Sequence, residues 1–350
     1  MNLKKEKISN IKNNNIYKIT LTNDQNYSVS FYNFGCYFHS LSIPYKHNID
    51  QTEDVLLGYQ NFENYILDDS YMNCIIGRTA GRIFNSNFNI NGKKYQLFSN
   101  EEKNHLHGGQ NGFNKKIWNL EEIRNYKDEI ICCLKYKSID LEEGYPGNLE
   151  CYIKYIFNNQ NELIIEFKAI TDFDTIVNLT NHNYWNFHGH NNYYSNIIDH
   201  TINLHSDSFY ETDEYFIPTG KIISSNNTKF DFKKNTIIDE KILSDGGIDT
   251  FYMLNSNNTS IKKAATVYSN KTRMGMDLYC DKPGIMFYTG NMMNTSYFGK
   301  YNKNYGSQYG LCLEPQFLTE LKNKENFHKL KLSPEETYQS KIHIKLANDF

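Results

Sequence analysis

Hydrophobic and polar residues alternate along most of the chain, in short runs separated by turn residues. The clearest runs are residues 17–22, 27–32, 149–157 and 163–170. Alternation with a period of two predicts half-buried strands, and Asn91-Gly92 between two short runs predicts a two-residue hairpin. Helical periodicity is nearly absent, with residues 61–71 as the main candidate for a turn or two of helix. The pattern therefore predicts an all-β fold, a sandwich or a barrel.

The domain organisation follows from the same pattern. No linker rich in Pro, Gly or Ser divides the 350 residues, and no clean internal repeat is evident. All-β chains often remain one unit well beyond the usual domain length. We therefore expect a single domain over residues 16–350. Residues 1–15 are polar, and we expect them to form a flexible N-terminal extension.

Composition narrows the class of protein. Hydrophobic residues make up 39% and charged residues 22%, as in globular proteins. The net charge of −3 with scattered Lys and Arg argues against nucleic acid or an anionic membrane as partner. The seven cysteines lack a C-x-x-C spacing and fit a reducing compartment. No secretory signal and no run of the ~18–20 apolar residues that span a bilayer is present. We expect a soluble cytoplasmic protein.

The richest stretch is residues 178–189, which read NLTNHNYWNFHG. Asn181 and His182 offer an amide and an imidazole from one short segment, and three aromatic residues follow within five positions. Polar groups beside aromatic faces suit a sugar, so Asn181 and His182 are candidate sugar ligands. The alternative is a hydrogen-bonded core histidine among core aromatics. His188 and His190 fall in a polar, Asn-rich stretch, and we expect both to be exposed.

Two further clusters combine polar groups with glycines. His105 and His107 would share one face of a strand. They could join a metal site with a further His and a carboxylate, or one could contact a substrate while the other is structural. Arg78 and Arg82 flank two glycines. We interpret Arg78 as a buried structural salt bridge and Arg82 as a rigid donor fork for sugar oxygens or a carboxylate.

Two carboxylates complete the candidate chemistry. Glu314 ends an apolar run, and burial would raise its pKa and make it a usable base. Asp249 stands in a similar context, in GGIDTF. Two such carboxylates also leave glycoside hydrolysis open. The sequence contains no nucleophile elbow, phosphate-binding loop, dinucleotide fingerprint or H-E-x-x-H motif.

Together these motifs resemble the galactose mutarotase (aldose 1-epimerase) family. In the family's order, the matching segments are GRTAGRI (77–83), NHLHGG (104–109), GYPGNL (144–149), NLTNHNYWNFHG (178–189), IPTGKI (217–222), GIDTF (247–251), FYTGN (287–291) and CLEPQ (312–316). The resemblance implies one large antiparallel β-sandwich that binds its sugar in an open cleft.

The resemblance also implies roles for single residues. Glu314 matches the catalytic base, which takes the proton from the C1 hydroxyl of the sugar, and His182 matches the acid that protonates the ring oxygen. His107 matches a second histidine near the ring oxygen, and Arg82 and Asp249 match residues that hold sugar hydroxyls. The implied reaction interconverts the α and β anomers of a hexose such as glucose or galactose. It requires neither a metal nor a cofactor.

Several positions depart from the family pattern. They are Gly81 (often Asn), Thr250 (commonly His), Met286 (usually Gln), Pro315 (commonly Thr) and Thr319-Glu320 (a Pro-Asp pair). The acid and the base remain, so we expect catalysis to be retained. Two alternatives stay open: a non-catalytic sugar-binding protein of the same fold, and an epimerase for phosphorylated sugars, which would need a basic pocket. We expect a monomer or a weak homodimer.

Overall fold

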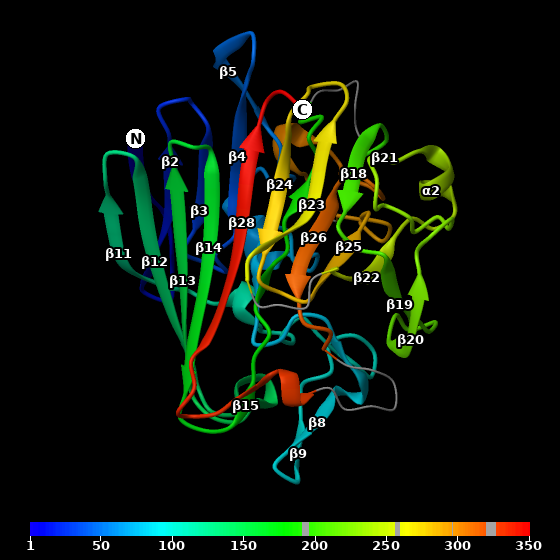
Figure 1. The fold of residues 1–350 in the computed structure, drawn as a ribbon. Coiled ribbons are helices and arrows are strands. Elements are labelled where there is room, and N and C mark those ends of the chain that lie inside the picture. Colours follow the sequence, from blue (N-terminus) through cyan, green and yellow to red (C-terminus); the bar gives the residue numbers. More distant parts are fainter. Residues whose placement is uncertain (191–195, 256–259, 296, 320–326) are drawn as a thin grey trace.

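Antiparallel strands dominate the computed structural model, which describes residues 1–190, 196–255, 260–295, 297–319 and 327–350. The largest sheet has nine strands and lies across the front of Figure 1. A five-stranded and a six-stranded sheet lie behind it. The fold is therefore a β-sandwich, as the alternation and the resemblance both predict.

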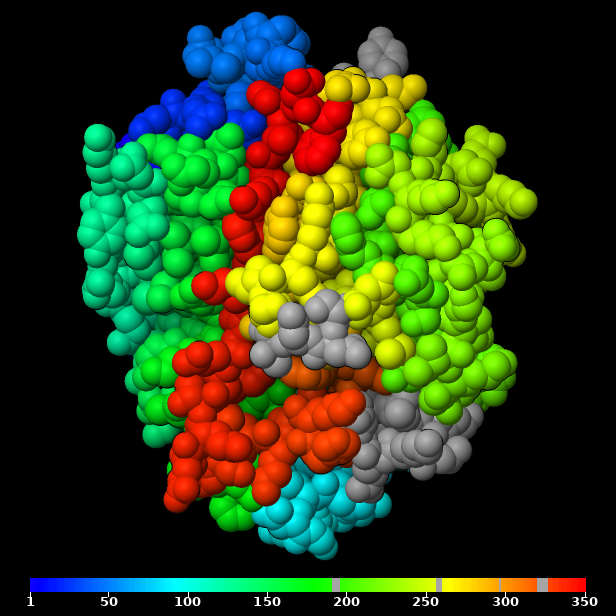
Figure 2. Space-filling model, viewed as in Figure 1, coloured from blue at the N-terminus to red at the C-terminus, as the bar shows by residue number. Residues whose placement is uncertain are grey.

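The nine-stranded sheet runs in the order β11-β12-β13-β14-β28-β24-β23-β18-β21. Its strands are β11 (Asn119–Asn125), β12 (Glu129–Ser138), β13 (Leu149–Asn158), β14 (Glu162–Thr171), β28 (Tyr338–Ala347), β24 (Gly275–Cys280), β23 (Lys262–Ser269), β18 (His200–Leu204) and β21 (Thr236–Ile237). Figure 2 shows this face, with β28 in red between the green and yellow parts of the chain.

The five-stranded sheet is a meander of consecutive strands. They are β1 (Asn2–Ile11), β2 (Asn14–Thr22), β3 (Ser28–Tyr32), β4 (Phe38–Tyr45) and β5 (Asn48–Asp54). The prediction of a flexible extension over residues 1–15 is wrong, because β1 pairs with β2 from Asn2 opposite Thr22 to Ile11 opposite Asn14. β1 is an edge strand without a fully buried residue, so its polar composition hid it. A single domain over residues 16–350 stays a prediction.

The six-stranded sheet runs in the order β17-β26-β25-β22-β19-β20. Its strands are β17 (Tyr184–Trp185), β26 (Leu311–Gln316), β25 (Gly284–Tyr288), β22 (Asp249–Met253), β19 (Ser208–Thr212) and β20 (Pro218–Ser224). Every residue of β26 is buried. The sequence around Glu314 is apolar because this strand lies inside the sheet rather than at its edge.

Short elements connect the large sheets. They are α1 (Phe62–Leu67), α2 (Glu240–Ser244), β6 (Ile75–Ile76), β7 (Arg82–Ile83), β8 (Asn87–Ile90), β9 (Lys93–Gln96), β10 (His105–Leu106), β15 (Thr175–Ile176), β16 (Thr180–Asn181) and β27 (Lys331–Leu332). α1 confirms the helical turns predicted within residues 61–71, and the β8–β9 pair confirms the hairpin at Asn91-Gly92. No helix in the described part of the chain has the length and hydrophobicity of a membrane-spanning segment.

The main core lies where the sheets meet. Leu21 comes from the five-stranded sheet, Ile153 and Ile165 come from the nine-stranded sheet, and Leu313 comes from the six-stranded sheet. All four are at most 3% exposed. Burying one such aliphatic side chain contributes about 1.5–3 kcal/mol relative to leaving it in water, so this layer holds the strands that carry the candidate site.

Candidate active site

A cavity of about 330 Å³ lies over one face of the six-stranded sheet. Strands β26, β25 and β22 supply one side, and the segments around β7, β10 and β17 supply the other. Five of the six candidate residues predicted from the sequence line it. They are Arg82, His107, His182, Asp249 and Glu314. Its size suits a small molecule.

Glu314 is a buried carboxylate that is poorly partnered. Its side chain is 2% exposed, and its Oε1 lies 3.5 Å from Nε2 of His182. Its Oε2 has no hydrogen-bond partner among the described residues. Burial, with Asp249 nearby, raises the pKa of Glu314 well above its ordinary value, although Arg82 opposes the shift. Glu314 can therefore hold a proton in the pH range where most carboxyls have lost theirs.

His182 stands between β16 and β17, and its backbone is fixed on both sides. Its N–H donates to the carbonyl of Cys74 at 3.0 Å, and its carbonyl accepts from the N–H of Asn73 at 3.0 Å. Its ring lies nearly parallel to that of Tyr184, with centroids 5.1 Å apart. Nδ1 is 3.6 Å from Sγ of Cys312. Burial lowers the pKa of His182 to about 4, which favours the neutral imidazole.

His107 lies directly after β10 and completes the cluster. Its ring centroid is 5.2 Å from that of His182 and 4.9 Å from that of Tyr71. The N–H of Gly81 donates to Nδ1 of His107 at 3.3 Å, which leaves Nε2 as the N–H donor of the neutral ring. Burial lowers the pKa of His107 well below its ordinary value. His107 is therefore a neutral hydrogen-bonding group beside the acid and the base.

Arg82 and Asp249 bring opposite charges to the same cavity. Nε and Nη2 of Arg82 donate to the two carboxylate oxygens of Glu101, each at 2.8 Å. This bidentate pair leaves the donors on Nη1 for a ligand. The guanidinium also lies over the ring of Phe216, 5.2 Å from its centroid. Burial raises the pKa of Asp249, and Arg82 opposes that shift.

The sixth candidate, Asn181, does not line the cavity. Its Nδ2 donates to the carbonyl of Cys74 at 3.2 Å, so the amide supports the turn that carries His182. Of the three aromatic residues that follow, only Tyr184 lines the cavity, because Trp185 and Phe187 stack on each other in the core. Alternation explains the division, since neighbouring residues of an extended segment face opposite sides.

Arg78 and His105 have structural roles. The sequence predicts a structural role for Arg78 and allows one for His105. Arg78 is 2% exposed, but its partners are the carbonyls of residues 138, 139, 146 and 147 and two hydroxyls rather than a carboxylate. The predicted salt bridge is therefore wrong, although the structural role is right. Nε2 of His105 lies 2.6 Å from the hydroxyl of Tyr145, and its Nδ1 lies 2.7 Å from the carbonyl of Phe98.

The prediction that His188 and His190 are exposed is wrong. His188 is 2% exposed, with Nδ1 2.7 Å from Oγ of Ser269 and Nε2 2.7 Å from the carbonyl of Ile198. His190 is half-buried, and its Nε2 lies 3.1 Å from the carbonyl of Leu56. The polar sequence around them misled the prediction, because both imidazoles bond to groups elsewhere in the fold.

Some of the departures from the family pattern line the cavity. Gly81, Met286 and Thr319 line it, whereas Thr250 and Pro315 do not. The Oγ1 of Thr319 donates to the carbonyl of Ala80. It lies where a side chain at position 81 would go, since a Cβ there would be 2.9 Å from it. Glu320 lies outside the described residues.

Sequence reasoning missed four residues that shape the site. Tyr71, Glu101 and Phe216 come from loops without a motif, and no local signal could have found them. Gln316 could have been found, because it stands two positions after Glu314 and so shares its face of the strand.

The same cluster has the makings of a metal site. One ligand atom from each of His107, His182 and Glu314 falls within 4.8 Å of the others. Two imidazoles and a carboxylate suit a transition metal ion. Proton transfer by His182 and Glu314 requires these same atoms to be free. Metal-free chemistry therefore stays a prediction for this site.

A buried carboxylate and a buried imidazole that share a small cavity of a β-sandwich can perform acid–base chemistry on a small molecule. Comparison with known proteins makes this more specific. The family model for aldose 1-epimerase matches residues 17–345. The chain belongs to the aldose 1-epimerase family, whose members act on sugars.

Individual relatives agree with that assignment. The galactose mutarotase of Bos taurus is 32% identical over 334 residues, covering 95% of this chain and 94% of the relative. The aldose 1-epimerase of Escherichia coli is 30% identical and covers 87% of each chain. The crystal structure of an aldose epimerase homologue from C. elegans has a TM-score of 0.83 at 25% identity, covering 95% of this chain and 98% of that one.

Proposed function

We propose that the protein is an aldose 1-epimerase that interconverts the α and β anomers of a hexose such as glucose or galactose. The observation that carries the proposal is the contact between Oε1 of Glu314 and Nε2 of His182, 3.5 Å apart in a cavity of sugar size. The C1 hydroxyl and the ring oxygen of an aldose are bonded to the same carbon. One base and one acid this close can therefore serve both oxygens of one sugar.

The proposed mechanism moves two protons in each direction. Glu314 takes the proton of the C1 hydroxyl while His182 gives a proton to the ring oxygen, and the bond between C1 and the ring oxygen breaks. Rotation about the C1–C2 bond then exposes the other face of the aldehyde. Ring closure reverses the roles, so both residues return to their starting protonation. Each well-placed group of this kind contributes about 10²–10⁴-fold.

The proton inventory supports this cycle. Burial raises the pKa of Glu314 and lowers that of His182, so at a pH between these two pKa values the pair without sugar holds one proton, on the carboxyl. The mechanism also needs one proton on the pair, on His182 when the ring is closed and on Glu314 when it is open. A bound sugar shifts this shared proton rather than adding or removing one.

The remaining cavity groups are proposed to hold the sugar. His107, Arg82 and Asp249 offer hydrogen bonds to hydroxyl groups, and Tyr184 and Phe216 offer apolar faces to C–H groups. We propose a structural role for Asn181, which holds the turn before His182.

The charge of the cavity favours an unphosphorylated sugar. Among the described lining residues Arg82 is the single Lys or Arg side chain, and Glu101 already engages it. Asp69, Asp249 and Glu314 add negative or ionisable groups. A phosphate would meet repulsion without a compensating cation among the described lining residues. The proposed substrate is therefore a neutral aldose.

We also propose that one chain suffices for activity, as a monomer or a weak homodimer in the cytoplasm. One chain supplies every group assigned above, and the seven cysteines are all free thiols, as a reducing compartment allows. Gel filtration with light scattering, at concentrations that bracket the assay, would test the oligomeric state.

The function is tested by NMR exchange between the anomers of glucose and galactose. The parent should accelerate exchange far beyond buffer, and Glu314→Gln should lose about 10²–10⁴-fold. Glu121→Gln, at an exposed position of β11, is the matched control and should behave as the parent. A Glu314→Gln protein as fast as the parent would refute the assignment. Folded parent protein that binds sugar without accelerating exchange would favour the non-catalytic alternative.

A further inference from the structure

Gln316 is an unexplained polar group in the wall of the cavity. It is the last residue of β26, is 2% exposed and lines the cavity. Its Nε2 has no hydrogen-bond partner among the described residues. Buried side-chain donors in folded proteins are nearly always paired, so an unpaired amide facing a cavity points to a missing ligand.

The neighbours of Gln316 do not satisfy this amide. Met286 on the adjacent strand has a thioether in place of a good acceptor, and Oγ1 of Thr319 is already bonded to Ala80 and Asn178. Gly81 adds no side chain to compete.

Gly81 also gives the amide its space. A Cβ at position 81 would lie 3.3 Å from Oε1 of Gln316, closer than a relaxed contact. The backbone there has φ +80°, a conformation that favours glycine. Glycine at 81 therefore leaves the amide free to turn toward a ligand.

The spacing along β26 indicates where on the ligand Gln316 acts. Glu314 and Gln316 share a face of the strand, and residues two apart are separated by roughly 6.4–6.8 Å. That distance is comparable to the breadth of a pyranose ring. With Glu314 at C1, Gln316 lies beside the far side of the ring, where the C3 and C4 hydroxyls are.

We propose that Gln316 is a specificity-determining residue that hydrogen-bonds the C3 or C4 hydroxyl of the aldose. This inference rests on the proposed function for the position of C1. The amide offers both a donor and an acceptor, and a hydroxyl can answer either. A sugar without that hydroxyl leaves Nε2 of Gln316 buried and unpaired, so the site discriminates against it.

The test pairs one substitution with a set of deoxy sugars. Anomer exchange by NMR gives kcat/KM for glucose and for its 2-, 3-, 4- and 6-deoxy forms, with the parent and with Gln316→Leu. The parent should lose about 5- to 100-fold on the 3-deoxy or the 4-deoxy sugar. For Gln316→Leu, kcat/KM on glucose should fall by a similar factor. Its kcat/KM on the deoxy sugar that lacks the recognised hydroxyl should be no lower than its value on glucose. Its preference among the other sugars should match the parent's.

Gln110→Leu, at an exposed loop position, is the matched control and should reproduce the parent on every sugar. Equal losses by Gln316→Leu on all five sugars would indicate a packing role and overturn the proposal. A parent that treats all deoxy sugars as it treats glucose would overturn it too, without reliance on any variant.

Calorimetric binding of the same sugars to the parent separates this inference from the proposed function. A parent that binds glucose without turning it over contradicts the epimerase proposal. The Gln316 proposal then stands or falls on whether removal of the C3 or C4 hydroxyl weakens that binding.

Discussion

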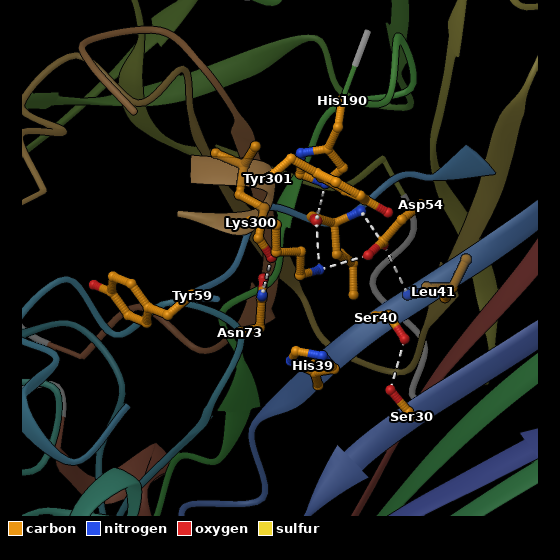
Figure 3. A network of polar contacts seen from close by, with 12 residues as sticks. Ser30, His39, Ser40, Leu41, Asp54, Tyr59, Asn73, His190, Lys300 and Tyr301 are labelled. Atoms are coloured by element: carbon orange, nitrogen blue, oxygen red, sulfur yellow. Dashed lines mark hydrogen bonds and ion pairs between the residues drawn. The ribbon is translucent and has the colours of Figure 1, made fainter. Parts of the chain in front are cut away.

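Two of the buried groups of ionisable side chains in the described residues differ in how well they are partnered. Around Lys300, Nζ binds Oδ2 of Asp54 at 2.7 Å and the carbonyl of Leu56 at 2.9 Å, while Oδ1 of Asp54 accepts the N–H groups of Leu41 and Leu56 (Figure 3). Around Glu314, Nε2 of His182 is 3.5 Å from one carboxyl oxygen, and the other oxygen has no hydrogen-bond partner among the described residues.

The difference teaches that partnering, more than burial, separates structure from chemistry here. The side chains of Lys300 and Asp54 are 6% and 9% exposed, close to the 6% and 2% of His182 and Glu314. Lys300 and Asp54 satisfy each other and tie the segment after residue 296 to the end of β5. Glu314 and His182 leave hydrogen-bonding capacity that a substrate can use.

The largest expected effect comes from Glu314→Gln, which should lower activity and raise stability. Activity should fall about 10²–10⁴-fold. Burial raises the pKa of Glu314 above its ordinary 4.5 in the folded parent. The free energy of unfolding of the parent therefore falls as pH rises above 4.5, because the unfolded chain loses this proton more easily. The variant should therefore unfold at higher urea than the parent at pH 8, and at the same urea at pH 4. A variant that loses stability at pH 8 would contradict the comparison.

Lys300→Met should lower stability and leave activity nearly unchanged. Removing one partner of a buried ion pair leaves the Asp54 carboxylate uncompensated, which typically costs about 3–5 kcal/mol. Urea unfolding should reveal this loss, while activity per folded molecule stays near the parent's at low temperature. Lys221→Met breaks an exposed pair with Glu211 and is the matched control, with an expected change below about 1 kcal/mol. Equal effects at the two lysines would remove the distinction drawn here.

The pH dependence of kcat/KM should be bell-shaped, because the active pair carries one proton. At low pH a second proton adds to His182, whose pKa burial lowers to about 4, so activity should fall as pH approaches 4. At high pH the last proton leaves Glu314, whose pKa burial raises, so activity should fall there too. NMR exchange rates across the pH range in which circular dichroism reports folded protein would measure both limbs. A profile that rises steadily with pH would contradict a shared proton.

The smallest expected effect is at Cys312. Burial raises the pKa of this thiol, so it stays protonated, and its Sγ lies 3.6 Å from Nδ1 of His182. The proton transfer assigned to Nε2 leaves the neutral ring with its one proton on Nδ1, where the sulfur can accept a hydrogen bond from it. Cys312→Ala should lower kcat about 2- to 10-fold, in line with one ordinary hydrogen bond, and Cys312→Ser should restore it. Nitrogen NMR shifts of His182 would report the tautomer directly. An unchanged tautomer in the alanine variant would remove this role.

Much of the fold was predictable because a strand with one buried face has alternating hydrophobic and polar residues. The strands around residues 149–157 and 163–170 alternate cleanly, since one face meets the core and the other meets water. β1 was missed because an edge strand with no buried face lacks that signal. His188 was missed for a different reason, since its partners are far away in the chain or are backbone carbonyls that any sequence provides.

The candidate site was predictable in its charged residues and less so in its surroundings. Glu314 stood out because it interrupts an apolar segment, and His182 stood out because it lies next to an amide and close to three aromatic residues. Asn181 stood beside His182 in sequence, but adjacent residues of an extended segment face apart, and its amide serves the backbone. Glu101 gave no signal, because its pairing with Arg82 arises from the way two loops meet.

Strand β28 lies in the middle of the nine-stranded sheet, yet it follows all its sheet neighbours in sequence. Ribosomal synthesis therefore delivers β14 and β24 first, each with an open edge that waits for the same segment. Until β28 inserts, two half-sheets expose unpaired backbone that can join another chain. Shortened chains without residues 338–347 should consequently aggregate rather than fold into a smaller sandwich, and co-expressed chaperones should matter most for this late closure.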